Sequence, residues 1–91
     1  MDYRILYHPR VDSEDIPILP DTIKRRVKRA IDDRLVTYPD LYGKPLRKGL
    51  HRFRKLRIGD WRIVYRIDDK DVIIFIIAHR AKIYQHVFER V

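Results

Sequence analysis

The stretch RKLRIGDWRIVYRIDDKDVIIFIIA, residues 54–78, decides the fold, because it predicts three consecutive strands joined by two short turns. Residues 61–67 alternate apolar and polar side chains with a period of two, as a half-buried strand does. Gly59-Asp60 before them predicts a tight hairpin, with the glycine at the positive-φ position of a type II′ turn. Residues 72–78 are continuously apolar, which predicts the central or most buried strand, covered on both faces.

The N-terminal half adds one strand and two helical segments. Residues 3–7 alternate like a strand, and residues 11–19 allow only a short helical piece because they contain Pro17. Asp21 is a good capping residue, and the apolar residues after it recur at helical spacing to about Tyr38, which predicts one long helix. The other face of this helix carries five cations. These could bind phosphates, but the preferred interpretation is a solvent-facing surface. They are Lys24, Arg25, Arg26, Lys28 and Arg29.

Together these elements predict an α+β fold of order β-α-α-β-β-β. We expect a mainly antiparallel four-stranded sheet, two N-terminal helices packed on one face, and a short C-terminal helix with Ile83 and Val87 inward. Phe53 has the wrong parity for the core face of its strand, and a bulge near Arg54 would restore the register. The 91 residues suffice for a single domain over 1–91.

Composition limits the class of partner and the compartment. The formal net charge of +8 creates a positive field that attracts nucleic acid and acidic proteins. The chain has no cysteine, which fits a reducing compartment. It shows no signal peptide, and its longest apolar run falls far below the roughly 18 residues of a membrane span, so we expect a cytoplasmic protein without membrane contact.

The segment from Leu41 to Gly59 is strongly basic and contains no acidic residue. Its seven cations are a third of the chain's 21 lysines and arginines. Three basic blocks could meet on the sheet face opposite the helices. Packing like charges together is costly unless a polyanion neutralises them, so such a convergence would indicate a polyanionic ligand. These blocks are Lys55 with Arg57, Arg62, and His79-Arg80 with Tyr84.

The string LRKGLHRFRKLRIGDWRIVYRI, residues 46–67, followed by VIIFIIAHRAKIY, residues 72–84, resembles the RelE/ParE superfamily of toxins. Members carry a basic R-x-G-D-aromatic-R-x-x-Y hairpin and a later H-R-x-x-x-Y block, and the N-terminal half is similar too. The RelE-like branch implies the toxin of a type II toxin–antitoxin system, a metal-independent endoribonuclease, or mRNA interferase, that cuts mRNA in the ribosomal A site. An antitoxin protein holds such a toxin inactive, and neither a metal nor a small-molecule cofactor is implied.

The resemblance also implies roles for individual residues. Lys55 and Arg57 match the basic strand pair, where arginine departs from the lysine common in ribosome-dependent cutters. A guanidinium stays protonated, so Lys55 is the better base for attack by the RNA 2′-hydroxyl on the adjacent phosphate, and neighbouring cations favour its neutral amine. Arg57 and Arg62 would clamp the phosphate.

Further along the chain, Arg80 would neutralise the leaving 5′-oxygen, while Tyr84 would orient the 2′-hydroxyl or stack on a base. His79 is either an alternative acid or base, or a strand-end histidine that hydrogen-bonds the backbone and shapes the site. The basic segment adds four expected RNA-binding residues, Arg47, Lys48, Arg52 and Arg54.

The residues leave two alternatives open and disfavour a third. A ParE-like protein of the same fold would inhibit DNA gyrase by binding, without the catalytic cations, and a degenerate toxin would only bind its antitoxin. The acid-free segment disfavours a branch that pairs a glutamate base with a histidine. Trp61 and Tyr65 are interpreted as packing residues, and the four histidines lack metal-ligand spacing.

Overall fold

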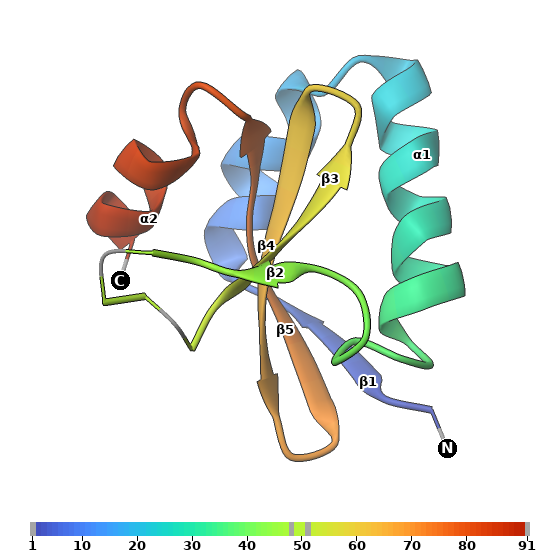
Figure 1. The fold of residues 1–91 in the computed structure, drawn as a ribbon. Coiled ribbons are helices and arrows are strands. Elements are labelled where there is room, and N and C mark those ends of the chain that lie inside the picture. Colours follow the sequence, from blue (N-terminus) through green and yellow to red (C-terminus); the bar gives the residue numbers. More distant parts are fainter. Residues whose placement is uncertain (1, 48, 51, 91) are drawn as a thin grey trace.

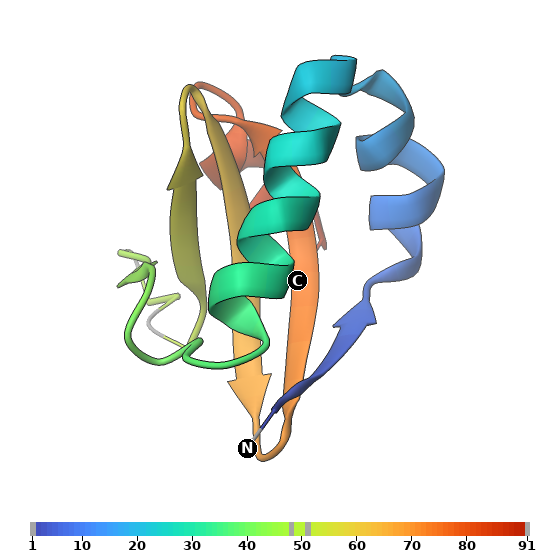
Figure 2. The ribbon, with the colours of Figure 1, turned by 90° about the vertical axis from the view of Figure 1, so that its right-hand side faces the viewer.

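The computed structural model describes residues 2–47, 49–50 and 52–90, which form a five-stranded mixed sheet with helices on both faces (Figures 1 and 2). The strands lie in the order β1-β5-β4-β3-β2. The elements are β1 (Arg4–Tyr7), helical turns η1 (Val11–Asp15) and η2 (Ile16–Ile18), α1 (Asp21–Ala30) continued by η3 (Ile31–Leu35), β2 (Lys44–Pro45), β3 (Arg54–Ile58), β4 (Trp61–Asp68), β5 (Asp71–His79) and α2 (Ile83–Arg90).

The α+β class is confirmed, and three of the four strand pairings are antiparallel, but the sheet is mixed and has five strands where four were expected. β1 pairs with β5 in parallel, and the helices and strands β2 to β4 lie between the two strands in the chain. The fifth strand, β2, lies in a segment whose glycines and Pro45 predict a loop. Proline is tolerated there because β2 is the edge strand, where one side needs no backbone donor.

The long helix is confirmed, and its ends differ from the expected ones. Pro20 is the N-cap residue and no side chain caps the helix, so the expected capping by Asp21 is wrong. Asp21 lies in the first turn, where a carboxylate still stabilises the positive end of the helix dipole. The helical turns end at Leu35, three residues before Tyr38.

The sheet has two cores, one on each face. α1, η1 and η2 cover the first, where Tyr65 and Ile63 are fully buried. α2 covers part of the second face with Ile83 and Val87, as expected. Phe53 belongs to this second core, so its parity needs no bulge at Arg54, and the β3–β4 register is continuous there. The register shift lies instead between Val64 and Tyr65, against β5.

The strand pattern of residues 54–78 is confirmed in its main features. Gly59 has a φ of +60° in the two-residue turn between β3 and β4. β5 is buried on both faces and is the most buried strand, although β4 is the central one. No helix in the part of the chain that the structure describes is long and apolar enough to cross a bilayer.

A buried ion pair fixes the C-terminal end of α2. The Arg90 guanidinium donates to both Asp15 carboxylate oxygens, at 2.7 and 2.9 Å, and to the Phe75 carbonyl oxygen at 3.1 Å. Asp15 also accepts the backbone N–H of Ile77 at 2.9 Å. The two side chains are 2% and 5% exposed, so α2, β5 and η1 are joined inside the protein.

Candidate active site

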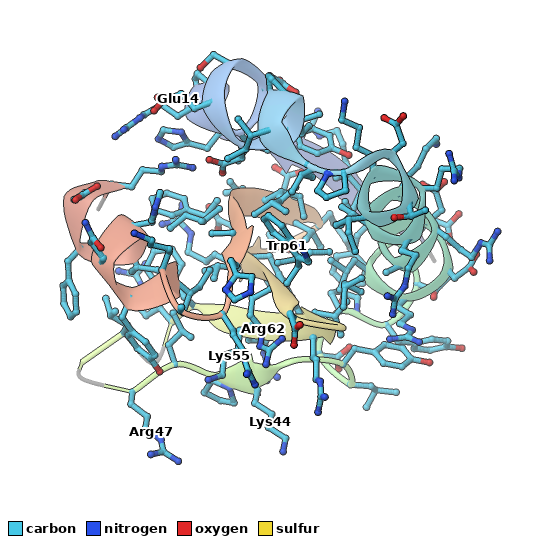
Figure 3. All side chains as sticks on the ribbon, turned by 90° about the horizontal axis from the view of Figure 1, so that it is seen from above. Glu14, Lys44, Arg47, Lys55, Trp61 and Arg62 are labelled. Atoms are coloured by element: carbon cyan, nitrogen blue, oxygen red, sulfur yellow. The ribbon has the colours of Figure 1, made fainter. Side chains whose placement is uncertain are left out.

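A groove of about 530 Å³ opens at the outer edge of β3. β2 pairs only with Arg54 and Lys55, so within the described residues no strand covers β3 beyond this point. Six cations line this groove, and none of its lining residues is acidic. The six are Arg34, Lys44, Arg47, Lys55, Arg57 and Arg62. Because the resemblance implies RNA cleavage by residues that line it, the groove is hereafter called the cleavage groove. Figure 3 shows Lys44, Lys55 and Arg62 on one side of the molecule, with Glu14 on the opposite side.

Arg57 and Arg62 face each other across the β3–β4 hairpin, as the turn at Gly59 dictates. Arg62 is half-buried, and its Nη1 donates to the carbonyl oxygens of Gly59 and Trp61, both at 2.9 Å. Burial lowers the pKa of Arg62, and the charges of Arg57 and Arg80 lower it further. The hairpin therefore concentrates positive charge, and a bound anion would reduce the repulsion between these cations.

Lys55 lies beside α2 at the same groove. Its Nζ is 5.6 Å from the centroid of the Tyr84 ring, a cation–π distance. The Tyr84 hydroxyl accepts the backbone N–H of Arg47 at 3.3 Å. Tyr84 thus connects α2 to the cation of β3 and to the backbone that follows β2.

His79 and Arg80 lie at the end of β5, beside the hairpin turn and outside the lining of the cleavage groove. His79 pairs with Trp61, and the His79 Nδ1 accepts the Ala81 backbone N–H at 3.2 Å. A backbone-bonded strand-end histidine has this geometry, in which a neutral ring carries its proton on Nε2. The Arg80 Nε is 3.9 Å from an Asp60 carboxylate oxygen.

The four expected RNA-binding residues fall in different places. Arg47 lines the cleavage groove, and its side chain is exposed. Arg54 donates from Nη1 to the Gly43 carbonyl oxygen at 3.2 Å and so holds the loop before β2. Arg52 lines a separate groove with His8 and Phe75, while Lys48 lies outside the described residues.

Two groove cations were not among the expected site residues. Lys44 belongs to the acid-free basic segment, so composition could have flagged it, whereas Arg34 arrives from η3 and no sequence spacing relates it to β3. Tyr65 and Trp61 pack in the first core, as expected. Within residues 2–47, 49–50 and 52–90, no group of three or more His, Asp or Glu side chains is arranged to hold a metal ion.

Comparison with known proteins identifies the family. The sequence profile described as the ParE toxin of the type II toxin–antitoxin system parDE matches residues 5–84. This chain belongs to the RelE/ParE superfamily of toxins. It is 34% identical over 84 residues to Toxin RelE of Mycobacterium tuberculosis, an alignment that covers 87% of each chain. Toxin RelG of the same organism is 38% identical over 73 residues, covering 78% of this chain and 84% of RelG.

Solved structures of this superfamily share the fold. The toxin–antitoxin complex RelBE2 of M. tuberculosis contains a chain with a TM-score of 0.79 and 32% identity, covering 88% of this chain and 100% of that one. Free E. coli toxin RelE, as a mutant, has a TM-score of 0.79 at 18% identity, covering 100% and 99%. Its identity is low, so that second likeness supports the fold alone.

Proposed function

We propose that this superfamily member is a RelE-type endoribonuclease that cleaves mRNA in the ribosomal A site without a metal ion. The observation that carries this proposal is the convergence of Lys55, Arg57 and Arg62 on a groove whose lining contains no carboxylate. A groove with this charge suits a phosphodiester, because arginine binds phosphate oxygens through two parallel hydrogen bonds. The 34% identity to a RelE toxin favours the same branch.

In the proposed reaction the RNA 2′-oxygen attacks the adjacent phosphorus. The bond to the 5′-oxygen breaks, which leaves a 2′,3′-cyclic phosphate and a 5′-oxyanion. Solvent water protonates this oxyanion to a 5′-hydroxyl, and the base returns its proton to solvent. Lys55 takes the proton of the 2′-hydroxyl, since an amine can exist neutral whereas a guanidinium does not. Arg57 and Arg62 stabilise the charge on the phosphate oxygens, and Arg62 is already oriented by its two backbone bonds.

Residues from the end of β5 and from α2 complete the proposed site. Arg80, whose charge acts on Arg62, would stabilise the departing 5′-oxygen. Tyr84 would hold the 2′-hydroxyl or stack on a base beside Lys55. The bond from Ala81 to the His79 Nδ1 favours a shaping role for His79, with its Nε2 as the alternative acid or base.

The protein partner in this proposal is an acidic antitoxin. Three of the structural relatives are complexes of RelE toxins with RelB antitoxins or an antitoxin peptide, including one from Methanococcus jannaschii. The net charge of +8 suits an acidic chain that folds onto the toxin and neutralises it.

Primer extension on translated mRNA tests the activity. We expect cuts inside codons only when ribosomes are present, and a loss of at least about a hundredfold in rate for Lys55→Ala, as removal of a general base costs. Lys70→Ala removes the same charge at the exposed β4–β5 turn and should cut at the wild-type rate. Equal cleavage by the Lys55 and Lys70 variants would contradict the role of Lys55.

A second candidate activity is inhibition of DNA gyrase by binding, since the matching profile is that of ParE toxins. A supercoiling assay with purified gyrase separates the two activities. Inhibited supercoiling together with intact translated mRNA would sink the nuclease proposal. Inhibition of supercoiling should then persist in the Lys55→Ala variant, because binding to gyrase needs no proton acceptor.

A further inference from the structure

The cations of α1 divide between two sides of the helix. Lys28 forms an ion pair with Asp32 at 3.0 Å, on the side that lines an apolar hollow beside η2. Arg26 and Arg29 lie on another side, where they line a surface together with Arg57 and Ile58 of β3. Of the carboxylates described in the structure, none lies within ion-pair distance of Arg26 or Arg29.

The surface between α1 and β3 forms a second groove of about 180 Å³, hereafter the helix groove. Four arginines line it, together with a single carboxylate, that of Asp33. The arginines are Arg26, Arg29, Arg34 and Arg57. Arg26 and Arg29 are exposed, as the solvent-facing interpretation predicts, but they also line this groove beside β3.

The helix groove adjoins the cleavage groove. Arg34 and Arg57 line both, so the two share a wall of guanidinium groups. At the hairpin end, Arg26 reaches the β3–β4 turn, where a Cβ placed on Gly59 would lie 3.2 Å from the Arg26 Nη1. Cations thus line the surface from the hairpin turn, along α1, to Lys44 on β2, and Asp33 is the one carboxylate in the lining of the two grooves.

Four guanidinium groups beside one carboxylate repel each other, and a polyanion would offset that repulsion. The repeating anion that matches planar guanidinium groups is phosphate. An acidic protein segment fits less well, because a folding peptide also needs apolar surface. That surface lies on the other side of α1, around Ile16 and Leu19.

We propose that the helix groove binds the sugar–phosphate backbone of the RNA strand next to the cleaved phosphate. The inference rests on the proposed function, because it assumes that RNA occupies the cleavage groove. Arg34 and Arg57 hold the strand where it passes from one groove to the other, and Arg26 and Arg29 bind the phosphates beyond. These contacts read no base, so they raise affinity for any sequence.

Two double variants with the same charge change test the helix groove. Arg26→Gln/Arg29→Gln removes its two helix arginines, whereas Lys24→Gln/Arg25→Gln removes two cations that do not line it. The probes are fully 2′-O-methylated RNAs of about three and about twelve nucleotides, which cannot be cleaved and which bracket a single-strand site. Fluorescence anisotropy gives the affinity at several salt concentrations.

For the twelve-nucleotide RNA we expect the first double variant to lose roughly tenfold or more in affinity. The slope of log affinity against log salt should become shallower by about 1.4, because each lost phosphate contact on a single strand contributes about 0.7. The Lys24/Arg25 variant should change both quantities far less. The three-nucleotide RNA fits the cleavage groove alone, so both double variants should bind it like the wild type.

Equal losses in the two double variants would overturn the helix groove, because the effect would then be general charge. Failure of wild-type protein to bind either RNA would overturn the helix groove, whereas the proposed function is overturned separately, by intact mRNA in the primer-extension assay with ribosomes. Binding of the short RNA without any preference for the long one leaves the cleavage groove standing and overturns the helix groove alone. If Arg26→Gln/Arg29→Gln weakens poly-glutamate binding and not RNA binding, the occupant is an acidic protein, and the RNA proposal is wrong.

Discussion

Tyr65 connects the first core to the outer wall of the cleavage groove. Its side chain is fully buried, and its hydroxyl donates to the Pro39 carbonyl oxygen at 2.7 Å and also contacts the Tyr42 carbonyl oxygen. These bonds hold the loop that leads into β2 and Lys44. Burial raises the pKa of Tyr65 from 10.0 to about 12.

Tyr65→Phe should lower the free energy of unfolding by about 1–3 kcal/mol at pH 8, because a buried carbonyl loses its donor. Between pH 10 and about 12 the difference in free energy of unfolding between the wild type and Tyr65→Phe should narrow. Tyr65 ionises in the unfolded chain before it ionises in the folded one, so the wild type loses up to about 2 kcal/mol over this range, and the variant does not.

Urea unfolding at a series of pH values measures both effects. Tyr38→Phe is the control, since Tyr38 is 57% exposed. A constant gap between wild type and Tyr65→Phe from pH 9 to pH 11.5 would show that the Tyr65 hydroxyl ionises equally in both states.

Gly43 provides a second residue-scale test of the same wall. Its φ is +74°, and an added Cβ would collide with the Tyr65 hydroxyl. Gly49 has a φ of +78° with no atom within 4 Å of such a Cβ. Gly43→Ala should therefore cost about 1–3 kcal/mol more than Gly49→Ala, because only the backbone strain is common to both. Equal unfolding midpoints would mean that the loop moves away without cost.

Individual residues were predictable from sequence where local geometry decides their position. Alternation along β3 and β4 and the turn at Gly59 place Arg57 opposite Arg62, and the sequence shows both features. Arg34 could not be found this way. It reaches the groove from η3, and its distance from β3 depends on tertiary packing that no sequence spacing contains.

At the scale of elements, α2 depends on the Asp15–Arg90 ion pair for its anchorage. Arg90 is the last residue of α2, while Tyr84 in the first turn contacts Lys55. The ion pair and the groove therefore hold opposite ends of one short helix. Ile83 and Val87 of the same helix also pack in the second core.

Arg90→Met should destabilise the protein by about 3–5 kcal/mol, because it leaves the Asp15 carboxylate buried without its cation. Amide exchange in α2 should speed up more than exchange in β4, since the loss is local to the helix anchor. The double variant Asp15→Asn/Arg90→Met removes both charges and should recover part of the loss. Urea unfolding and hydrogen exchange measure these changes.

Arg4→Met serves as the matched control, because it breaks the Arg4–Asp71 ion pair, in which Arg4 is 72% exposed. Solvent screens that pair, so its loss should hardly change stability. If Arg90→Met and Arg4→Met behave alike, the buried pair does not anchor α2.

The sequence predicted whether an element is a helix or a strand more readily than which strands pair with each other. Period-two alternation indicated β1, β3 and β4, a continuous apolar run indicated β5, and helical spacing indicated α1 and α2. The number of strands was wrong because β2 owes its pairing to the loop that Tyr65 holds, not to its own propensity. Phe53 misled the register argument because, in a sheet with a core on each face, a side chain of either parity can be buried.

At the scale of the whole molecule, positive charge is distributed unevenly. In the described part of the chain, the carboxylates of Asp71, Glu14, Asp32, Asp60 and Asp15 are in ion pairs with cations outside the lining of the cleavage groove. The grooves beside β3 thus retain their excess. Net charge indicated a polyanionic partner from sequence alone, but only the fold shows that two grooves share Arg34 and Arg57.

This field should control how fast an acidic antitoxin associates with the protein. We expect the association rate constant with the product of the neighbouring small gene to fall about tenfold or more between 50 and 500 mM salt, because steering acts over a Debye length that shrinks with salt. The dissociation rate should change little, since it depends on contacts already formed. Stopped-flow fluorescence measures both rate constants.

Lys24→Gln/Arg25→Gln should slow association at low salt and match the wild type at high salt. A salt effect confined to dissociation would mean that short-range contacts, and not the field of the +8 charge, govern the encounter.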